Sequence, residues 1–205
     1  MTEPSASRGR ILAAARAFVT ADGVDAVSMR KVAAEVGLAP TAIYWHVGSR
    51  EDLLNAVLDE MIADLPPIRA RGTGPRDRIA SVARGARQEF HDHVRTLQLA
   101  TELGRGNELS FRAQVALARE MTAAGLDGDD AVAALRSILF LVGGFVMIEE
   151  EYRQREPAQV GTRHLWAGVV DEAIDPAIRA AMTGPTDTDS LFTYTLDRLL
   201  DAVLD

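Results

Sequence analysis

SMRKVAAEVGLAPTAIYWHVGSREDLL, residues 28–54, is the stretch that decides the fold of this chain. Ser28 is suited to cap a helix, because its hydroxyl can accept a hydrogen bond from an amide of the first turn. Gly37 readily takes the left-handed conformation that ends a helix, and Pro40 suits the first position of the next one. The stretch therefore predicts two short helices joined by a tight turn.

The second of these helices is predicted to have one inner and one outer side. Ile43, Tyr44 and Val47 are expected to face inward at helical spacing. A helix, a short turn and a helix that exposes small polar residues form a shape that fits the DNA major groove. The outer side or its margin is expected to hold Thr41, Ala42, Trp45 and His46.

The neighbouring segments complete a small helical unit. Gly48 ends the second helix, and Ser49 with Asp52 resembles a capping box that begins another. Residues 7–21 predict a first helix, which would pack on the stretch above to make a miniature core. Its apolar face consists of Ile11, Ala14, Ala15, Phe18 and Val19.

The pattern AAEVGLAPTAIYWHVGSREDLLNAVL resembles the DNA-binding domain of the tetracycline-repressor (TetR) family of transcriptional regulators. The likeness extends over roughly residues 11–61 and becomes one of layout beyond them. One departure is Ala39, where the family often has a hydroxyl side chain, so the recognition helix lacks a side-chain cap. The matching features are Gly37, Pro40, Tyr44, Trp45, His46 and the Ser49-Arg50 pair before Leu53-Leu54.

The resemblance implies which side chains contact double-stranded DNA. Arg30 would reach a guanine edge or a phosphate, and Thr41 and Ala42 lie where base edges and thymine methyl groups are contacted. Without the resemblance, packing and plain solvation explain several of these residues equally well. The contacts to the DNA backbone would come from Tyr44, His46 and Arg50.

Composition and charge bound the remaining possibilities. The 205 residues allow one sizeable domain, or a small domain joined to a larger one. The absence of cysteine excludes disulfides and thiolate metal sites. The first ten residues lack a hydrophobic signal core, which favours a cytoplasmic location. Acidic and basic residues balance up to residue 56, so the net charge of −8 lies beyond it and a locally basic DNA-binding face is permitted.

Apolar periodicity predicts an all-α chain without strands. We expect a helix-turn-helix DNA-binding domain over residues 1–52, a connector helix over 50–65, and a ligand-binding and dimerisation domain over 66–205. The larger domain begins with one long helix over 76–100. Polar breaks, including one over 157–163, separate the further helices, which are predicted over 110–124, 131–155, 165–173, 176–182 and 190–204.

The most apolar segment is ILFLVGGFVMI, residues 138–148. It is shorter than the roughly 20 residues that span a bilayer, so no membrane partner is expected. A helix that is apolar nearly all round is buried in a core or a subunit interface. The resemblance implies a homodimer formed through a four-helix bundle. We assign to this interface Leu135, Leu139, Val142, Phe192, Leu196, Leu199 and Val203.

The resemblance also implies that the larger domain binds a small organic effector. The acidity of this domain disfavours an anion, so the expected effector is neutral or cationic and largely hydrophobic. In the resembled family, the tetracycline sites use histidines and a polar turn after the long helix. The corresponding residues 99–109, LATELGRGNEL, contain no histidine, so tetracycline is not the predicted ligand. The candidates follow from helix order, and for any single one of them plain core packing is the better explanation. The candidates are Phe90, His93, Leu97, Leu103, Met121, Leu139, Gly143, Met147 and Trp166.

Nothing in the sequence indicates catalysis, a cofactor or a metal. His91 and His93 point about 200° apart on a helix and cannot share an ion, and Glu89 with His93 is a single weak pair. The run Glu149–Glu151 reads as a solvated helix end, or as an acid that faces a cavity and meets a cationic ligand. Motifs for a nucleophile elbow, a phosphate loop, a paired-histidine zinc site and a dinucleotide fingerprint are absent, so an enzyme is not predicted.

We therefore interpret the chain as a homodimeric transcriptional regulator. The favoured interpretation is a repressor that a small hydrophobic ligand releases from a near-palindromic operator. Two alternatives stay open. One is a regulator without a small-molecule inducer. The other is a helical ligand carrier or enzyme with a vestigial DNA-binding domain.

Overall fold

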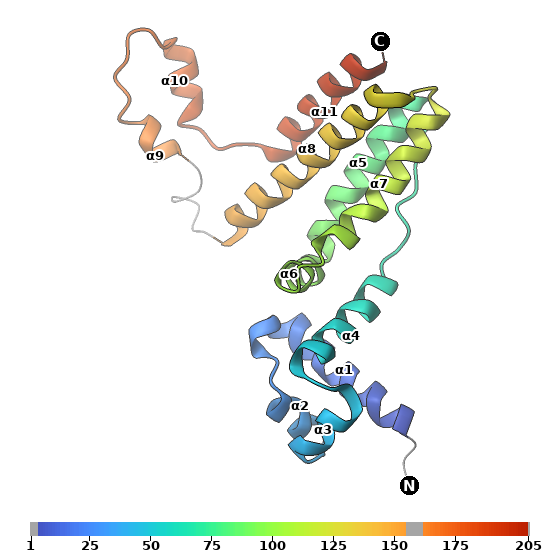
Figure 1. Cartoon of the computed structure of the whole chain (residues 1–205). Helices are drawn as coiled ribbons and strands as arrows, with labels where there is room; N and C mark the ends of the chain where they lie inside the picture. Colours follow the sequence, from blue (N-terminus) through green and yellow to red (C-terminus); the bar gives the residue numbers. More distant parts are fainter. Residues whose placement is uncertain (1–3, 155–161, 205) are drawn as a thin grey trace. The chain divides into compact units, whose positions relative to one another are not determined.

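The computed structural model describes residues 4–154 and 162–204, and these residues form helices and connecting turns with no strand (Figure 1). The all-α class is thereby confirmed. The helices are α1 (Pro4–Asp22), a short 3-10 helix η1 (Val24–Ala26), α2 (Met29–Val36), α3 (Pro40–Val47), α4 (Arg50–Ala63), α5 (Pro75–Asp92), α6 (Val94–Glu102), α7 (Gly106–Ala123), α8 (Gly128–Gln154), α9 (Arg163–Trp166), α10 (Pro176–Met182) and α11 (Thr188–Leu204).

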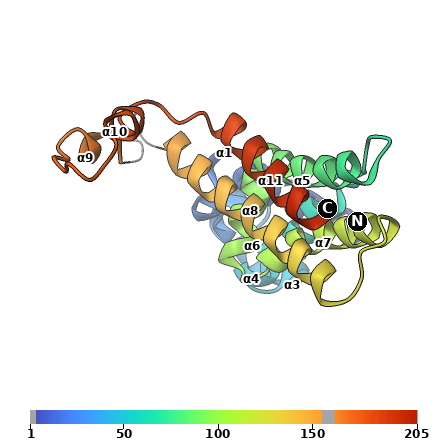
Figure 2. The same ribbon diagram turned by 90° about the horizontal axis from the view of Figure 1, so that it is seen from above.

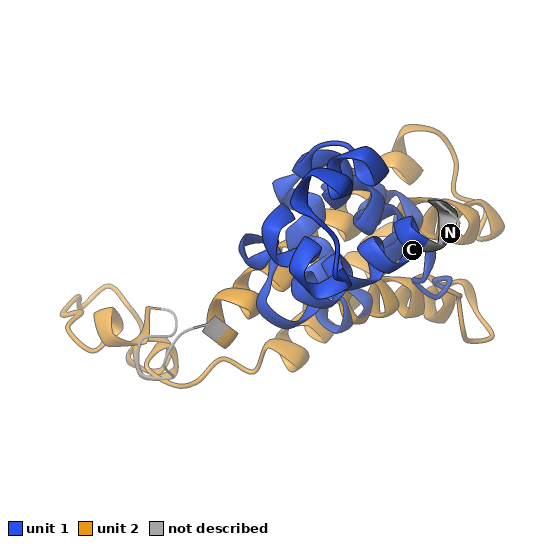
Figure 3. Ribbon diagram, turned by 90° about the horizontal axis from the view of Figure 1, so that it is seen from below, with its two compact units in different colours: residues 1–68, 89–113 blue, residues 69–88, 114–205 orange. Residues whose placement is uncertain are grey.

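Packing divides the chain into two compact units (Figure 3). Unit 1 comprises residues 1–68 and 89–113, and unit 2 comprises residues 69–88 and 114–205. Helices α5 and α7 therefore contribute residues to both units. The domain boundaries expected from the sequence stay a prediction, because compact packing does not show which segments fold or function alone.

The core of unit 1 joins the helix-turn-helix to α4 and α6. The predicted face of α1 is confirmed, since Ile11, Ala15 and Val19 are buried while Ala14 and Phe18 pack against the same cluster. Burying each large aliphatic side chain stabilises the fold by roughly 1.5–3 kcal/mol. The other helices add to this cluster Val32, Val36, Ile43, Val47, Leu53, Leu54, Val57, Leu58, Leu99 and Ala100.

The local signals at the ends of α2, α3 and α4 are confirmed. The Ser28 hydroxyl accepts a hydrogen bond from the Lys31 amide at 3.2 Å. Gly37 has φ 71° and ψ 33°, the left-handed conformation that ends α2. The Ser49 amide donates to Asp52 Oδ2 at 2.8 Å, and the Asp52 amide donates to Ser49 Oγ at 3.1 Å, which completes the capping box. Gly48 has φ 76°, and a Cβ there would lie 2.5 Å from Asp52 Oδ2, so this position requires glycine.

The capping box makes the stability of the protein depend on pH. Hydrogen bonds from the Ser49 amide and hydroxyl lower the pKa of Asp52. A lowered folded-state pKa stabilises the protein above the unfolded pKa, and this contribution is lost as pH falls through the folded-state pKa. We expect the Asp52→Asn variant to have a lower urea midpoint than wild type at pH 7, and the difference to shrink below about pH 4. Glu51→Gln is the control, since it removes a neighbouring carboxylate and leaves the box intact; an equal loss in both variants would contradict the assignment.

Unit 2 is built around α8 and α11, which lie side by side (Figures 1 and 2). The inner side of α11 presents Phe192, Leu196 and Leu200, each at most 1% exposed. The ring of Phe192 meets Phe145 of α8 edge to face, with the ring centroids 5.2 Å apart. Buried side chains from the other helices of this unit are Ile79, Val82, Ala83, Ala86, Leu117, Met121, Ala134, Ile138, Val142 and Val146.

Two expected elements differ from the structure. The long helix predicted over 76–100 is broken at His93, whose φ of −122° and ψ of 37° are not helical. The break lets α6 place Leu99 in the core of unit 1, while Ala83 and Ala86 of α5 lie in unit 2. The helix predicted over 165–173 shrinks to α9, because Gly168 and two β-branched residues follow it. Most of the break predicted over 157–163 lies outside the described residues.

One helix among the described residues, over Gly128–Arg153, is long and apolar enough to cross a membrane by length and composition. The expectation that this segment is too short is therefore wrong for the complete helix. The same composition is found in core helices of soluble proteins. Only 22% of its most apolar 18-residue stretch is buried, so α8 has an extensive apolar side that no described residue covers.

Candidate nucleic-acid interface and cavity

Helix α3 presents an exposed side that carries most of the predicted DNA contacts. Thr41 is exposed, and Ala42 and His46 are half-buried at its margin. Tyr44 is 54% exposed, so the expectation that it faces inward is wrong. Ile43 and Val47, four residues apart, are the buried residues of this two-turn helix and form its inner stripe, which does not include Tyr44.

Trp45 is the most exposed large side chain of α3, at 90%. The sequence placed it on the outer side without assigning it a role. An indole ring that faces solvent leaves a large apolar surface in contact with water. Such exposure is unusual on a surface that has no binding partner. The signal that identifies Trp45 was present in the sequence: it is the largest apolar group on the face opposite Ile43 and Val47.

Cations flank this surface. Arg30 and Lys31 of α2 are exposed. Arg50 behaves differently, since its Nε donates to the Val27 carbonyl at 2.9 Å and its Nη2 donates to the Val24 carbonyl at 3.0 Å. These bonds hold the first turn of α4 against η1. A phosphate contact from Arg50 would therefore use the donors that remain.

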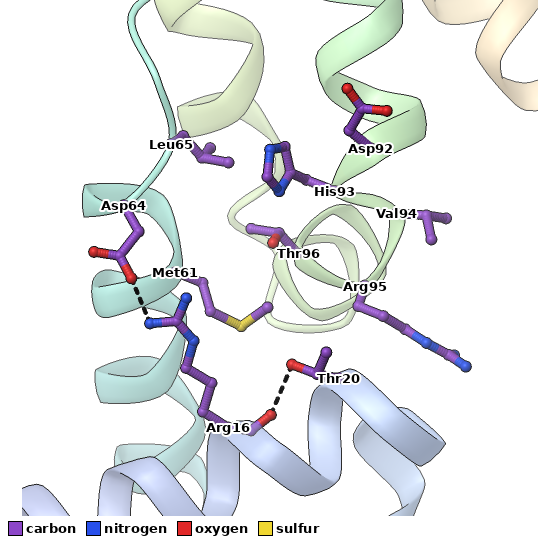
Figure 4. A pocket seen from close by; sticks show the side chains of 10 residues that line it. All are labelled: Arg16, Thr20, Met61, Asp64, Leu65, Asp92, His93, Val94, Arg95 and Thr96. Atoms are coloured by element: carbon purple, nitrogen blue, oxygen red, sulfur yellow. Dashed lines mark hydrogen bonds and ion pairs between the residues drawn. The ribbon is translucent and has the colours of Figure 1, made fainter.

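Unit 1 also contains a cavity of about 180 Å³ near the ends of α1, α4 and α5 and the beginning of α6 (Figure 4). Arg16 Nη1 lies 2.5 Å from Asp64 Oδ2 at its edge. The Thr20 hydroxyl donates to the Arg16 carbonyl at 2.9 Å. The lining residues are Arg16, Thr20, Met61, Asp64, Leu65, Asp92, His93, Val94, Arg95 and Thr96.

Comparison with known proteins identifies the family to which this helix-turn-helix segment is similar. Residues 11–57 match the model of bacterial regulatory proteins of the tetR family. An HTH-type transcriptional regulator of Saccharopolyspora erythraea is 31% identical over 162 residues, which are 79% of this chain and 68% of that protein. The chain belongs to the TetR family of transcriptional regulators.

Two further proteins resemble this TetR-family regulator, one in sequence and one in fold. The class A tetracycline repressor of transposon 1721 from Escherichia coli is 29% identical over 178 residues, which are 84% of this chain and 77% of that repressor. The fold matches the crystal structure of the TetR-family protein ActR of Streptomyces coelicolor in complex with actinorhodin, with a TM-score of 0.65 and 20% identity over 96% of each chain. The second likeness concerns the fold alone.

The predicted effector residues of the TetR-family regulator do not gather around this cavity. His93 lines it, whereas Phe90, Leu97 and Leu103 pack against the core of unit 1. The other five belong to unit 2: Met121 is buried, Leu139 and Gly143 are half-buried, Met147 is 75% exposed and Trp166 lies in α9. The placement of the effector pocket stays a prediction.

The predicted dimer residues separate into two groups. One group is buried inside the protomer and consists of Val142, Phe192 and Leu196. These side chains can pack beneath the residues of an interface but cannot contact a partner themselves. Half-buried positions are Leu135, Leu139, Leu199 and Val203. Exposed apolar side chains that the sequence did not assign to the interface are Phe140 at 79%, Tyr194 at 62% and Met147, a candidate pocket residue, at 75%. Their helices are apolar on several sides, so the pattern could not separate inner from outer positions.

Glu149 is the acid of the run 149–151 that faces the interior, at 7% exposed. Its carboxylate is bound by both Nε and Nη2 of Arg87. Arg87 Nη2 also lies 2.7 Å from Asp189 Oδ1, and its guanidinium carbon is 4.7 Å from the centroid of the Phe192 ring. Glu149 is therefore paired with a cation of the chain itself, Arg87, which links α5, α8 and α11.

Proposed function

We propose that this regulator is a homodimeric, cytoplasmic repressor without enzymatic activity, and that a small, largely hydrophobic ligand releases it from a near-palindromic operator. The observation that carries the proposal is the pairing of an exposed α3 surface with an uncovered apolar side of α8. The first provides a reading surface for one half-site. The second needs a partner, and a second copy of the chain supplies one by two-fold symmetry.

The apolar side of α8 favours a second copy over a lipid surface. Ala133, Arg136, Ser137, Phe140 and Gly144 recur along its exposed side at helical spacing. Arg136 would be costly at the depth of a bilayer core. The small residues beside Phe140 allow two helices to approach closely, so an isologous contact with the same face of a partner fits this side.

The test of DNA binding is a mobility-shift assay with DNA flanking the gene of this regulator, beside a scrambled sequence of equal length. We expect tight binding to a near-palindrome whose half-site centres lie about one helical turn apart or a multiple of it. The alternative of a carrier or enzyme with a vestigial DNA domain predicts equal, weak binding to both DNAs. A thermal-shift screen of small hydrophobic compounds then separates the inducer-controlled regulator from one without a small-molecule inducer.

Thr41 and Ala42 are expected to determine base preference. Both lie at the beginning of α3 on or beside its exposed side. We expect Ala42→Gln to change the preference at one or two base pairs in each half-site by about 1–3 kcal/mol per pair. The measurement is competition among operators that differ at single positions. A uniform loss over all operators would instead place Ala42 against the DNA backbone.

Phosphate contacts are assigned to Arg30, Tyr44, His46 and the remaining donors of Arg50. Each cation lost from a phosphate contact should reduce the slope of log affinity against log salt by about 0.9. Arg30→Ala tests the exposed cation without touching the two carbonyl bonds of Arg50. Arg95→Ala, a cation outside α2–α4, is the control and should leave the salt slope unchanged.

A further inference from the structure

Thr96 stands out among the residues that line the cavity of unit 1. The residue is 3% exposed, yet no hydrogen bond to its side chain is found in the described part of the chain. Within residues 4–154 and 162–204, no fully enclosed side-chain oxygen or nitrogen lacks a partner. The hydroxyl must therefore reach open space, and the space beside it is the cavity.

The surroundings of this hydroxyl are polar on one side and apolar on the other. Figure 4 shows Thr96 between the His93 ring and the Met61 side chain, with Leu65 above and Arg16 opposite. His93 begins α6 without providing a side-chain cap, so the positive end of this nine-residue helix borders the same space. A hydrogen-bonding oxygen and a short apolar group would both find partners here.

The charges around the cavity cancel. Arg16 is paired with Asp64, and Figure 4 shows Arg95 and Asp92 pointing away from Thr96. Glu89 is paired with Arg112 at 2.6 Å, and burial raises the pKa of this glutamate. An anion would meet Asp64 and a cation would meet Arg16, so neither is favoured over a neutral molecule.

We propose that this cavity binds a small neutral molecule that carries a carbonyl or hydroxyl oxygen. The oxygen bonds the Thr96 hydroxyl and the apolar part lies on Met61 and Leu65. The volume of about 180 Å³ is below the roughly 300–1,000 Å³ of pockets for drug-sized ligands, so the molecule is of small-metabolite size. The site shares only His93 with the predicted effector pocket, and it does not rest on the proposed function because its test needs neither DNA nor dimer.

The first test measures chemical access to Thr96. The chain has no cysteine, so Thr96→Cys introduces a single thiol. Ala100→Cys is the matched control, because Ala100 lies on the same helix, is 0% exposed and faces the core. We expect the small neutral reagent methyl methanethiosulfonate to modify Thr96→Cys at least about tenfold faster than Ala100→Cys, since the control must open locally before it reacts. Equal rates by mass spectrometry would overturn the proposal.

The second test measures which ligand charge the cavity accepts. Butyramide, butyrate and butylamine share a four-carbon frame and are neutral, negative and positive at pH 7. We expect butyramide to raise the unfolding temperature of wild type, which keeps the Thr96 hydroxyl, more than the other two do. A larger rise with butyrate or butylamine, or no rise with any of them, would overturn the assignment of a neutral ligand.

The third test uses the native side chain and remains informative if Thr96→Cys does not fold. A ligand that binds the folded state raises its unfolding temperature. Thr96→Val keeps the shape of the side chain and removes the hydroxyl. We expect butyramide to raise the unfolding temperature of wild type and to raise that of Thr96→Val less. An equal shift in both proteins would show that the hydroxyl does not take part.

Discussion

Phe140→Glu is expected to convert the regulator from a dimer to a monomer and to weaken operator binding by about 10²- to 10⁴-fold, because the two half-sites would no longer be bound by one linked molecule. Phe140 is 79% exposed in the protomer, so the change leaves the protomer core untouched. In the proposed dimer the same side chain is buried, and an unpaired carboxylate there would cost several kcal/mol. Sedimentation at micromolar concentration and a mobility-shift titration measure the two effects.

The control for this variant is Phe111→Glu. Phe111 is a 61% exposed phenylalanine on α7, outside α8 and α11. We expect the control to stay dimeric and to bind the operator as wild type does. A Phe140→Glu protein that sediments as a dimer, with an unchanged melting curve, would exclude this side of α8 from the interface.

Glu149→Ala is expected to lower the free energy of unfolding by about 3–5 kcal/mol, the usual cost of removing one partner from a buried ion pair. The side chains of Arg87 and Glu149 are 14% and 8% exposed, so the arginine would stay enclosed and, among the described residues, only the exposed Asp189 would be left to neutralise it. The guanidinium cannot escape the enclosed site by losing its proton, because arginine stays protonated in proteins. Urea unfolding at pH 7 measures the loss.

Two further variants show whether this loss of stability comes from leaving a buried charge without its partner. Glu150→Ala removes the neighbouring acid from its pair with Arg153, whose side chain is 45% exposed, and is expected to cost under about 1 kcal/mol. Arg87→Met combined with Glu149→Leu removes both charges and should recover most of the stability, because apolar replacements of similar volume are tolerated. A loss below 1 kcal/mol in Glu149→Ala would show that the pair is not enclosed in solution.

The helix-turn-helix was accessible from the sequence because its signals are local. Ser28, Gly37, Pro40 and the Ser49–Asp52 pair each act on backbone groups within a few residues, so their chemistry is the same in the sequence as in the fold. The outer face of α3 was less accessible. Tyr44 lies beside Ile43 in the pattern, and only packing against α1 and α2 decided that Ile43 and Val47 fill the inner side.

The sequence by itself determined the helical class, the caps and the recognition motif, since propensity, periodicity and backbone hydrogen bonding operate over single turns. Only the tertiary structure decided the break at His93, the exposed side of α8 and the partner of Glu149. Arg87 and Glu149 are 62 positions apart, and nothing in a pattern read along the chain connects them. Long-range pairing depends on how whole helices pack, because an apolar helix can bury any of its sides until its neighbours occupy one of them.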